Sequence, residues 1–164
     1  MKKIVVTGVK GSKSTILAQL IERGFVGVNG LIKCGVELRN NIKELLEDKD
    51  VVVVLTICHA ERTFEIGKSD ENDWLSAAEN FELFKNNPQV IPIRTETLIK
   101  YPNVVQNHLA DKLTLEKAKS FEHIMRKEKL DTTELAGPAR KWDEVEAMLE
   151  HSEVKAMIKR LDYE

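Results

Sequence analysis

The chain of 164 residues has little of the features that mark specialised classes of protein. Its two cysteines, Cys34 and Cys58, lie among apolar neighbours and form no C-x-x-C, which indicates buried thiols in a reducing setting rather than a disulfide framework. The four histidines lack the spacing of metal ligands. No apolar run is long enough for a membrane span or for the core of a signal peptide. These absences predict a cytoplasmic protein with no membrane anchor.

An excess of charge of one sign is also missing. The chain has 25 Lys and Arg residues against 27 Asp and Glu residues, a formal net charge of −2. Neither half carries a basic arm, so we expect no nucleic-acid partner. With 42% hydrophobic and 32% charged residues, the composition is that of a folded domain rather than a disordered chain, and the length suits one hydrophobic core.

A glycine-bearing segment near the amino end, GVKGSKST at residues 8–15, is the most informative stretch that is present. It follows KIVVT at residues 3–7, a β-branched run typical of a buried parallel strand. It precedes STILAQLIER at residues 14–23, whose apolar positions have the spacing of one helix face. The sequence therefore predicts a strand, a loop and a helix that begins between Lys13 and Ile16.

One inserted glycine would turn this segment into the phosphate-binding pattern G-x-x-x-x-G-K-[ST]. Such a loop works because backbone N–H groups and a helix N-terminus face the phosphates, a lysine reaches them, and a hydroxyl binds Mg²⁺. On this hypothesis Ser14 is the magnesium ligand, and the nucleotide-binding residues of the segment are Gly8, Gly11, Ser12, Lys13, Ser14 and Thr15. The missing glycine changes which N–H groups converge, so a plain strand-to-helix turn is the alternative.

The rest of the chain alternates between short strands and helices. The continuous apolar run VVVVLTI at residues 51–57 predicts a central strand, parallel and adjacent to residues 3–7. Further strands are expected over 25–28 and 90–93, and further helices over 36–47, 59–67 and 74–85. Beyond Thr95 only helices are expected, one starting at Thr114 and the last capped by Ser152, with a turn at Gly137-Pro138.

This alternation predicts an α/β fold, with a small parallel sheet of three to four strands, flanking helices and a helical C-terminal region. We expect a P-loop-like three-layer domain over 1–103. We expect residues 104–164 to form a helical extension packed on it, which leaves open a homodimer or a protein partner bound through these helices.

Residues 50–94, taken with residues 3–15, resemble nucleoside and nucleoside-monophosphate kinases of the P-loop superfamily, in the manner of thymidylate and deoxynucleoside kinases. In that family a strand, a short helix with an arginine, a charged lid, an amphipathic helix and a final strand follow one another. Here these are VVVVLTI, HAERTFEIGK, KSDEND, WLSAAENFELF and VIPIR.

The resemblance implies a phosphotransferase that uses Mg-ATP on a nucleoside or nucleotide. It implies that Lys13 and Arg62, with Lys68, are the cations that stabilise the transferred phosphoryl group, and that Arg94 lies near the base or the phosphates.

The sequence also departs from this family. The strand VVVVLTICH ends without the carboxylate that such kinases place there, and Asp50 lies at its other end. Glu37 and Arg39 are candidates for an acid–arginine pair. Two alternatives therefore stay open. One is an inactive member of the fold that acts as a binding or interaction module. The other is a dinucleotide-binding fragment, although the third glycine of that fingerprint is absent.

Overall fold

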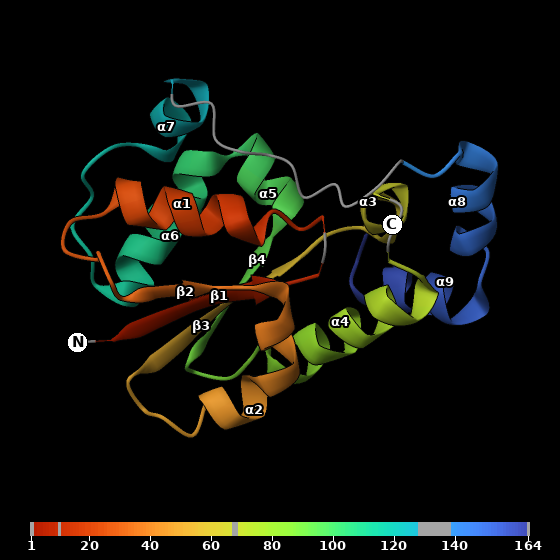
Figure 1. Cartoon of the computed structure of the whole chain (residues 1–164), viewed down its shortest axis with the longest axis horizontal. Helices are drawn as coiled ribbons and strands as arrows, with labels where there is room; N and C mark the ends of the chain where they lie inside the picture. Colours follow the sequence, from red (N-terminus) through yellow and green to blue (C-terminus); the bar gives the residue numbers. More distant parts are fainter. Residues whose placement is uncertain (1, 10, 67–68, 128–138, 164) are drawn as a thin grey trace.

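A four-stranded parallel sheet organises the chain, with its strands in the order β2-β1-β3-β4 (Figure 1). The computed structural model describes residues 2–9, 11–66, 69–127 and 139–163. The strands are β1 (Lys3–Gly8), β2 (Ile32–Cys34), β3 (Val51–Ile57) and β4 (Val90–Arg94). The predicted α/β fold with a small parallel sheet is confirmed.

The two predicted apolar runs lie side by side at the centre of the sheet. β1 pairs with β3 in parallel, from Lys3 opposite Val51 to Gly8 opposite Thr56. Every residue of β3 is buried, because helices cover both of its faces. This explains why the run is apolar throughout rather than alternating.

Helices cover the two faces of the sheet in two groups. The first group is α1 (Ser14–Gly24), α5 (Thr95–Lys100), α6 (Pro102–Leu113) and α7 (Phe121–Lys127). The second is α2 (Ile42–Leu45) and α4 (Glu71–Phe84), and residues of α8 (Trp142–Leu149) and α9 (Ser152–Arg160) join the same core. Successive side chains of β1 enter opposite cores, Val5 the second and Val6 the first, as the period of a strand requires. Figure 1 shows the three layers.

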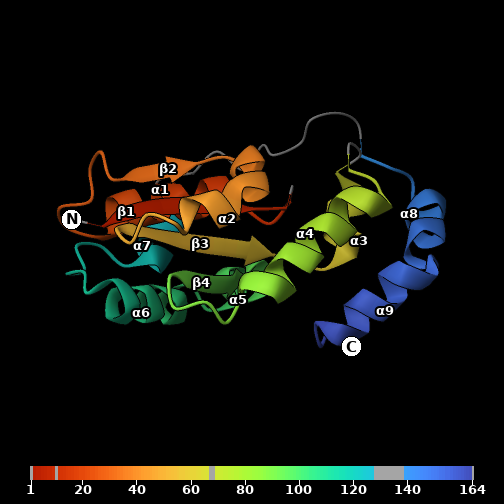
Figure 2. The same cartoon turned by 90° about the horizontal axis from the view of Figure 1, so that it is seen from below.

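The 3₁₀ helix η1 (Val36–Asn41) and the short helix α3 (Ala60–Glu65) complete the described elements. In Figure 2 the arrow of β3 points toward α3, α8 and α9, so these helices stand at the carboxyl end of the sheet. Within the described residues, no helix combines the length and the apolar character that crossing a membrane requires.

Four predicted elements differ from those observed, among them the last helix, α9, whose N-cap is His151 rather than Ser152. Residues 25–28 form no strand beyond an isolated bridge of Phe25 with Lys117; Gly27 and Gly30 have positive φ, and the chain becomes extended only at β2. The helix expected over 36–47 is instead η1 followed by α2. Thr114 does not start a helix: it ends α6 in the left-handed conformation, with φ of 53°.

The helix α4 also begins earlier than the sequence predicts. The predicted helix over 74–85 begins at Glu71, because Asp70 accepts the N–H of Asp73 while Asp73 accepts that of Asp70. The predicted turn at Gly137-Pro138 lies outside the described residues. The division of the chain at residue 103 stays a prediction.

Candidate functional site

Three segments come together at the carboxyl end of the sheet, where β1, β3 and β4 finish. These are the loop that follows Gly8, the residues after Ile57, and the start of α5 at Thr95. In open parallel sheets this edge is where ligands bind, because the loops there can be shaped without disturbing the strands. The segment at residues 8–15 therefore lies where a phosphate loop is expected.

The loop itself uses two unusual backbone conformations. Gly11 has φ of 87°, and Lys13, the residue before α1, has φ of 59°. A lysine in the left-handed region is uncommon, and it is held there by the surrounding contacts. The side chain of Lys13, the N-cap residue, makes no capping hydrogen bond to α1. The first turn of an eleven-residue helix therefore presents N–H groups and the positive end of its dipole toward the loop.

Buried hydroxyl groups fix the loop to the strands beneath it. The Ser12 Oγ lies 2.5 Å from the Val9 carbonyl and 2.6 Å from the Thr56 Oγ1, and the Thr56 hydroxyl donates to the Thr7 carbonyl. From the other side, the Thr95 hydroxyl donates to the Ser12 carbonyl at 2.5 Å. Ser12 is fully buried and anchors the loop to β3 and α5.

The other predicted loop residues differ in exposure. Lys13 is half-buried, Ser14 is buried and Thr15 is exposed. The structure brings Arg62 to the loop, since a Cβ built on Gly11 would lie 3.5 Å from both the Cγ and the carbonyl oxygen of Arg62. Lys68, its predicted companion, lies outside the described residues.

Arg94 is at the same edge but is engaged by the C-terminal segment. Its guanidinium donates to the carbonyl of Leu161 and lies 4.7 Å from the centre of the Tyr163 ring. The backbone N–H of His59 donates to the Glu96 carboxylate, and the His59 ring meets the Tyr163 ring edge-on at 5.3 Å. The guanidinium of Arg94, the carboxylate of Glu96 and the imidazole of His59 are therefore grouped around the Tyr163 side chain.

The His59 side chain caps α3. Its Nδ1 accepts the backbone N–H of Glu61 at 3.1 Å, so a neutral ring carries its proton on Nε2. The imidazole is therefore a hydrogen-bond donor in this arrangement. Cys58, its neighbour, is fully buried, with its Sγ 3.3 Å from the Thr63 hydroxyl.

The contacts beneath the loop are made by hydroxyl groups at the end of β3. Thr56, a neutral residue, stands where β3 reaches Ser12, and its hydroxyl is already bonded. Mg²⁺ prefers at least one carboxylate in addition to hydroxyl and phosphate oxygens. Among the residues that the structure describes, no group of three His, Cys, Asp or Glu side chains could hold a metal ion.

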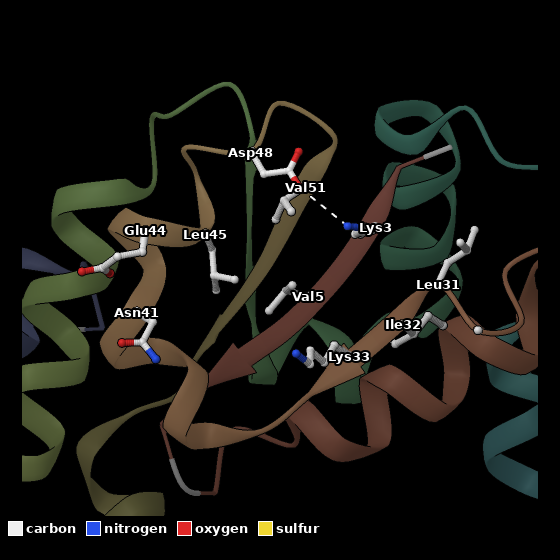
Figure 3. Close-up of a pocket in the computed structure, with 11 residues that line it drawn as sticks. Lys3, Val5, Leu31, Ile32, Lys33, Asn41, Glu44, Leu45, Asp48 and Val51 are labelled. Carbon is white, nitrogen blue, oxygen red and sulfur yellow. Dashed lines mark ion pairs between the residues drawn. The ribbon is translucent and has the colours of Figure 1, made fainter.

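A larger cavity lies away from this end of the sheet. Figure 3 shows it between β1, β2 and α2, where the cover of one sheet face is incomplete; its volume is about 780 Å³, and an ion pair of Lys3 with Asp48 at 3.7 Å borders it. Lys3 and Val51 mark the amino ends of their strands, so the cavity is remote from the loop and we do not regard it as the reaction site.

A smaller cavity of about 210 Å³ adjoins the loop. It is lined by Val9, Val36, Glu37, Arg39, Asn40, Ser69 and Asp73. The predicted acid–arginine pair therefore does lie next to the loop. Sequence reasoning missed Ser69 and Asp73, and also Thr56 and Thr95, because each meets the site through a contact with a residue far along the chain.

Comparisons with known proteins identify the fold. No family model and no curated protein matches the sequence. Among solved structures, the sulfotransferase domain from the curacin biosynthetic pathway matches with a TM-score of 0.61 and 11% identity, over 99% of this chain and 98% of that domain. A mouse sulfotransferase complexed with PAP matches with a TM-score of 0.55 and 14% identity, over 85% of this chain and 68% of that chain.

These likenesses agree with the geometry of the sheet and loop and support the predicted P-loop-like architecture, without singling out the nucleoside kinases. The chain has the three-layer, P-loop-like α/β fold that these sulfotransferases share.

Proposed function

We propose that the chain is a nucleotide-dependent transferase that binds the phosphates of its donor at the loop of residues 8–15 and transfers a sulfuryl group. The observation that carries this proposal is the loop itself: two left-handed residues, Gly11 and Lys13, lead into the uncapped N-terminus of α1 at the carboxyl edge of the sheet.

The electrostatics of the loop favour an anion. N–H groups at the start of α1 have no partners within the helix, and the helix dipole adds positive potential there. Lys13 supplies a full positive charge at the same point, and the backbone of Arg62 packs against Gly11. A bound phosphate would accept hydrogen bonds from the N–H groups at the start of α1 and from Lys13, in place of water.

A sulfuryl donor fits the residues better than Mg-ATP, the donor that the kinase resemblance implied. The Ser12–Thr56 contact occupies the place where β3 would need a carboxylate to hold a metal. A sulfuryl group carries less charge than a terminal phosphoryl group, so a lysine and backbone N–H groups can stabilise its transfer. The structural likeness to a sulfotransferase complexed with PAP supports the same choice.

The reaction balances as a simple displacement. The oxygen of an acceptor hydroxyl forms a bond to sulfur, and the bond between sulfur and the bridging phosphate oxygen breaks. The electron pair of that bond leaves on the nucleotide phosphate, and the hydroxyl proton passes to water. Charge develops on the bridging oxygen, where a cation and a helix N-terminus have their greatest effect.

Calorimetric titration with PAP, an adenosine bisphosphate, tests the binding step. We expect saturable binding in the presence of EDTA, because the site provides its own positive charge. Mg-ATP is the comparison ligand. A ligand at 100 times its dissociation constant stabilises the fold by about 2.7 kcal/mol, so thermal unfolding gives an independent measurement.

Transfer is then measured with a donor that carries labelled sulfur on the 5′-phosphate of PAP. Binding of Mg-ATP but not of PAP would overturn the sulfuryl proposal in favour of phosphoryl transfer. Absence of binding by either nucleotide would overturn the nucleotide site and favour an interaction module.

A further inference from the structure

The cavity of about 210 Å³ beside the loop, here the Arg39–Ser69 cavity, is lined by buried polar atoms that no described residue satisfies. It lies between Val9 of the loop, η1 and the start of α4. The Thr7 hydroxyl donates to the Gly35 carbonyl at 2.7 Å, which holds η1 against the end of β1. The cavity is therefore a fixed part of the carboxyl edge.

Two buried polar atoms on its walls have no hydrogen-bond partner among the described residues. They are the Nε of Arg39 and the Oγ of Ser69, whose side chain is 1% exposed. An unsatisfied buried donor or acceptor costs about 1–3 kcal/mol, so such groups are rare in folded proteins, and a bound ligand or water is one way to satisfy them. That two of them line one small cavity is a separate observation from the loop geometry.

Ser69 is held in place by its backbone. Its carbonyl accepts a hydrogen bond of 2.5 Å from the guanidinium of Arg140, which also donates to the Phe64 carbonyl at 3.0 Å. The backbone of Ser69 is thus held in place, while its hydroxyl has no hydrogen-bond partner among the described residues.

The charges on the walls restrict the ligand. Arg39 is opposed by two carboxylates, those of Glu37 and Asp73. Burial lowers the pKa of Arg39, while the charge of Asp73 raises it. A polyanion would be repelled by the carboxylates of Glu37 and Asp73. An ammonium group has no acceptor atom, so it would leave the Arg39 Nε–H unsatisfied. A neutral hydroxyl group both donates and accepts, so a molecule with several hydroxyls can pair with the guanidinium, the serine and the carboxylates together.

The size of the cavity agrees with a small ligand. Because a water molecule occupies about 30 Å³ of liquid, the cavity holds roughly seven waters or a compact molecule of that volume.

We propose that the Arg39–Ser69 cavity binds the acceptor of the transfer reaction, and that this acceptor is a small neutral polyhydroxylated molecule. The proposal rests on the proposed function, since it identifies the substrate class of the same site. Val9, the residue after Gly8, lines the cavity, so an acceptor held there would lie beside the loop that binds the donor.

The binding test uses glucose, galactose and myo-inositol as neutral probes and inorganic phosphate as the anionic probe. The side-chain Nε–H signal of Arg39 is followed by NMR during each titration. We expect at least one neutral probe to shift this signal saturably. Failure of all three, or a shift with phosphate alone, overturns the proposed ligand class.

Two variants remove the proposed contacts, and calorimetric titration with the neutral probe compares their affinities with that of the wild type. Ser69→Ala deletes one hydroxyl, and Arg39→Lys keeps the charge but deletes the Nε–H. Each should weaken binding of the neutral probe about tenfold, the value of one lost hydrogen bond to a charged or buried partner. The exposed Ser76→Ala and Arg160→Lys are the matched controls and should bind as the wild type does.

A PAP titration of the same variants separates this inference from the proposed function. We expect unchanged PAP affinity and, in the transfer assay, a raised KM for the polyol. Retained PAP binding without polyol binding would overturn the acceptor site alone. Polyol binding in a chain that binds no nucleotide would overturn its role as the acceptor.

Discussion

Ser12 and Thr56, 44 residues apart in the sequence, face each other across the ends of β1 and β3 with their hydroxyl oxygens 2.6 Å apart. The contact is fully buried and joins the loop to the central strand. It also narrows the space at Gly8, which pairs with Thr56 in the sheet. The shape of the candidate phosphate loop therefore depends on Thr56, a residue that lies outside the loop motif.

Gly8→Ala should strongly destabilise the fold. A Cβ at this position would lie 1.9 Å from the Thr56 Oγ1 and 2.5 Å from the Thr56 carbonyl, and the second of these is backbone that cannot rotate away. We expect a loss of about 3 kcal/mol or more, at the upper end of the range for overpacked sites. Urea unfolding measures it.

Gly35→Ala is the control for this prediction. The three atoms nearest to its Cβ would all belong to the flexible carboxyl end of Glu37, and its φ of 167° is ordinary extended backbone. We expect a loss below about 1 kcal/mol, as for a surface substitution. Similar losses at the two glycines would contradict the close approach of β1 and β3.

Val53→Lys should prevent cooperative folding. Val53 has no exposed surface, and it lies on the central strand with helices over both faces of the sheet. Burying an unpaired ammonium group would cost several kcal/mol, which is comparable to the stability of a domain of this size. Val26→Lys, at a residue that is 52% exposed, should fold normally. Circular dichroism with thermal unfolding distinguishes the two, and a soluble, cooperatively melting Val53→Lys would refute the prediction.

The parts of the site that could be predicted from the sequence are those formed by residues close together in the chain. The apolar runs that became β1 and β3, and the loop that leads to α1 at Ser14, follow from local periodicity and glycine placement. The part made by distant contacts was not visible. Thr95 reaches Ser12 across 83 residues, and no spacing rule relates their positions.

The same limit explains two helices that were misplaced. Thr114 has the composition of a helix N-cap, yet it adopts the left-handed conformation that ends α6. A threonine can serve at either end of a helix, and packing of α6 against the sheet decides which. Residues 36–47 have helical spacing, but close pairing of Gly35 with Val6 at the end of β1 favours a tighter first turn.

Tyr163 should make stability sensitive to alkaline pH. Burial raises the pKa of its hydroxyl well above the ordinary value, and the charge of Glu96 raises it further. The folded state therefore holds this proton more tightly than the unfolded state. The stability that this proton gives to the folded state is fully present below about pH 10 and is lost as the pH rises above that value. The free energy of unfolding should fall with pH in this range.

Tyr163→Phe removes the titrating hydroxyl while keeping the ring over Arg94. Its free energy of unfolding should therefore fall less steeply above about pH 10 than that of the wild type. Tyr101→Phe, at a residue that is 52% exposed, is the matched control and should follow the wild type. Identical alkaline slopes for Tyr163→Phe and the wild type would show that this proton is not linked to folding.

Lys13→Ala should weaken nucleotide binding without weakening the fold. In the proposed site the ammonium group forms a charge-assisted contact with a donor phosphate, and the loss of such a contact costs about 1.5–3 kcal/mol. The side chain is half-buried and contributes little to the two hydrophobic cores, so thermal unfolding should change only slightly.

Lys13→Arg keeps the charge and should recover part of the affinity. Lys43→Ala, an exposed lysine on α2, is the matched control. Calorimetry with PAP in EDTA compares all four proteins. Equal affinities for the wild type and Lys13→Ala would mean that phosphate binding, where it occurs, does not use this lysine, and that GVKGSKST is a strand-to-helix turn held by Ser12 and Thr56.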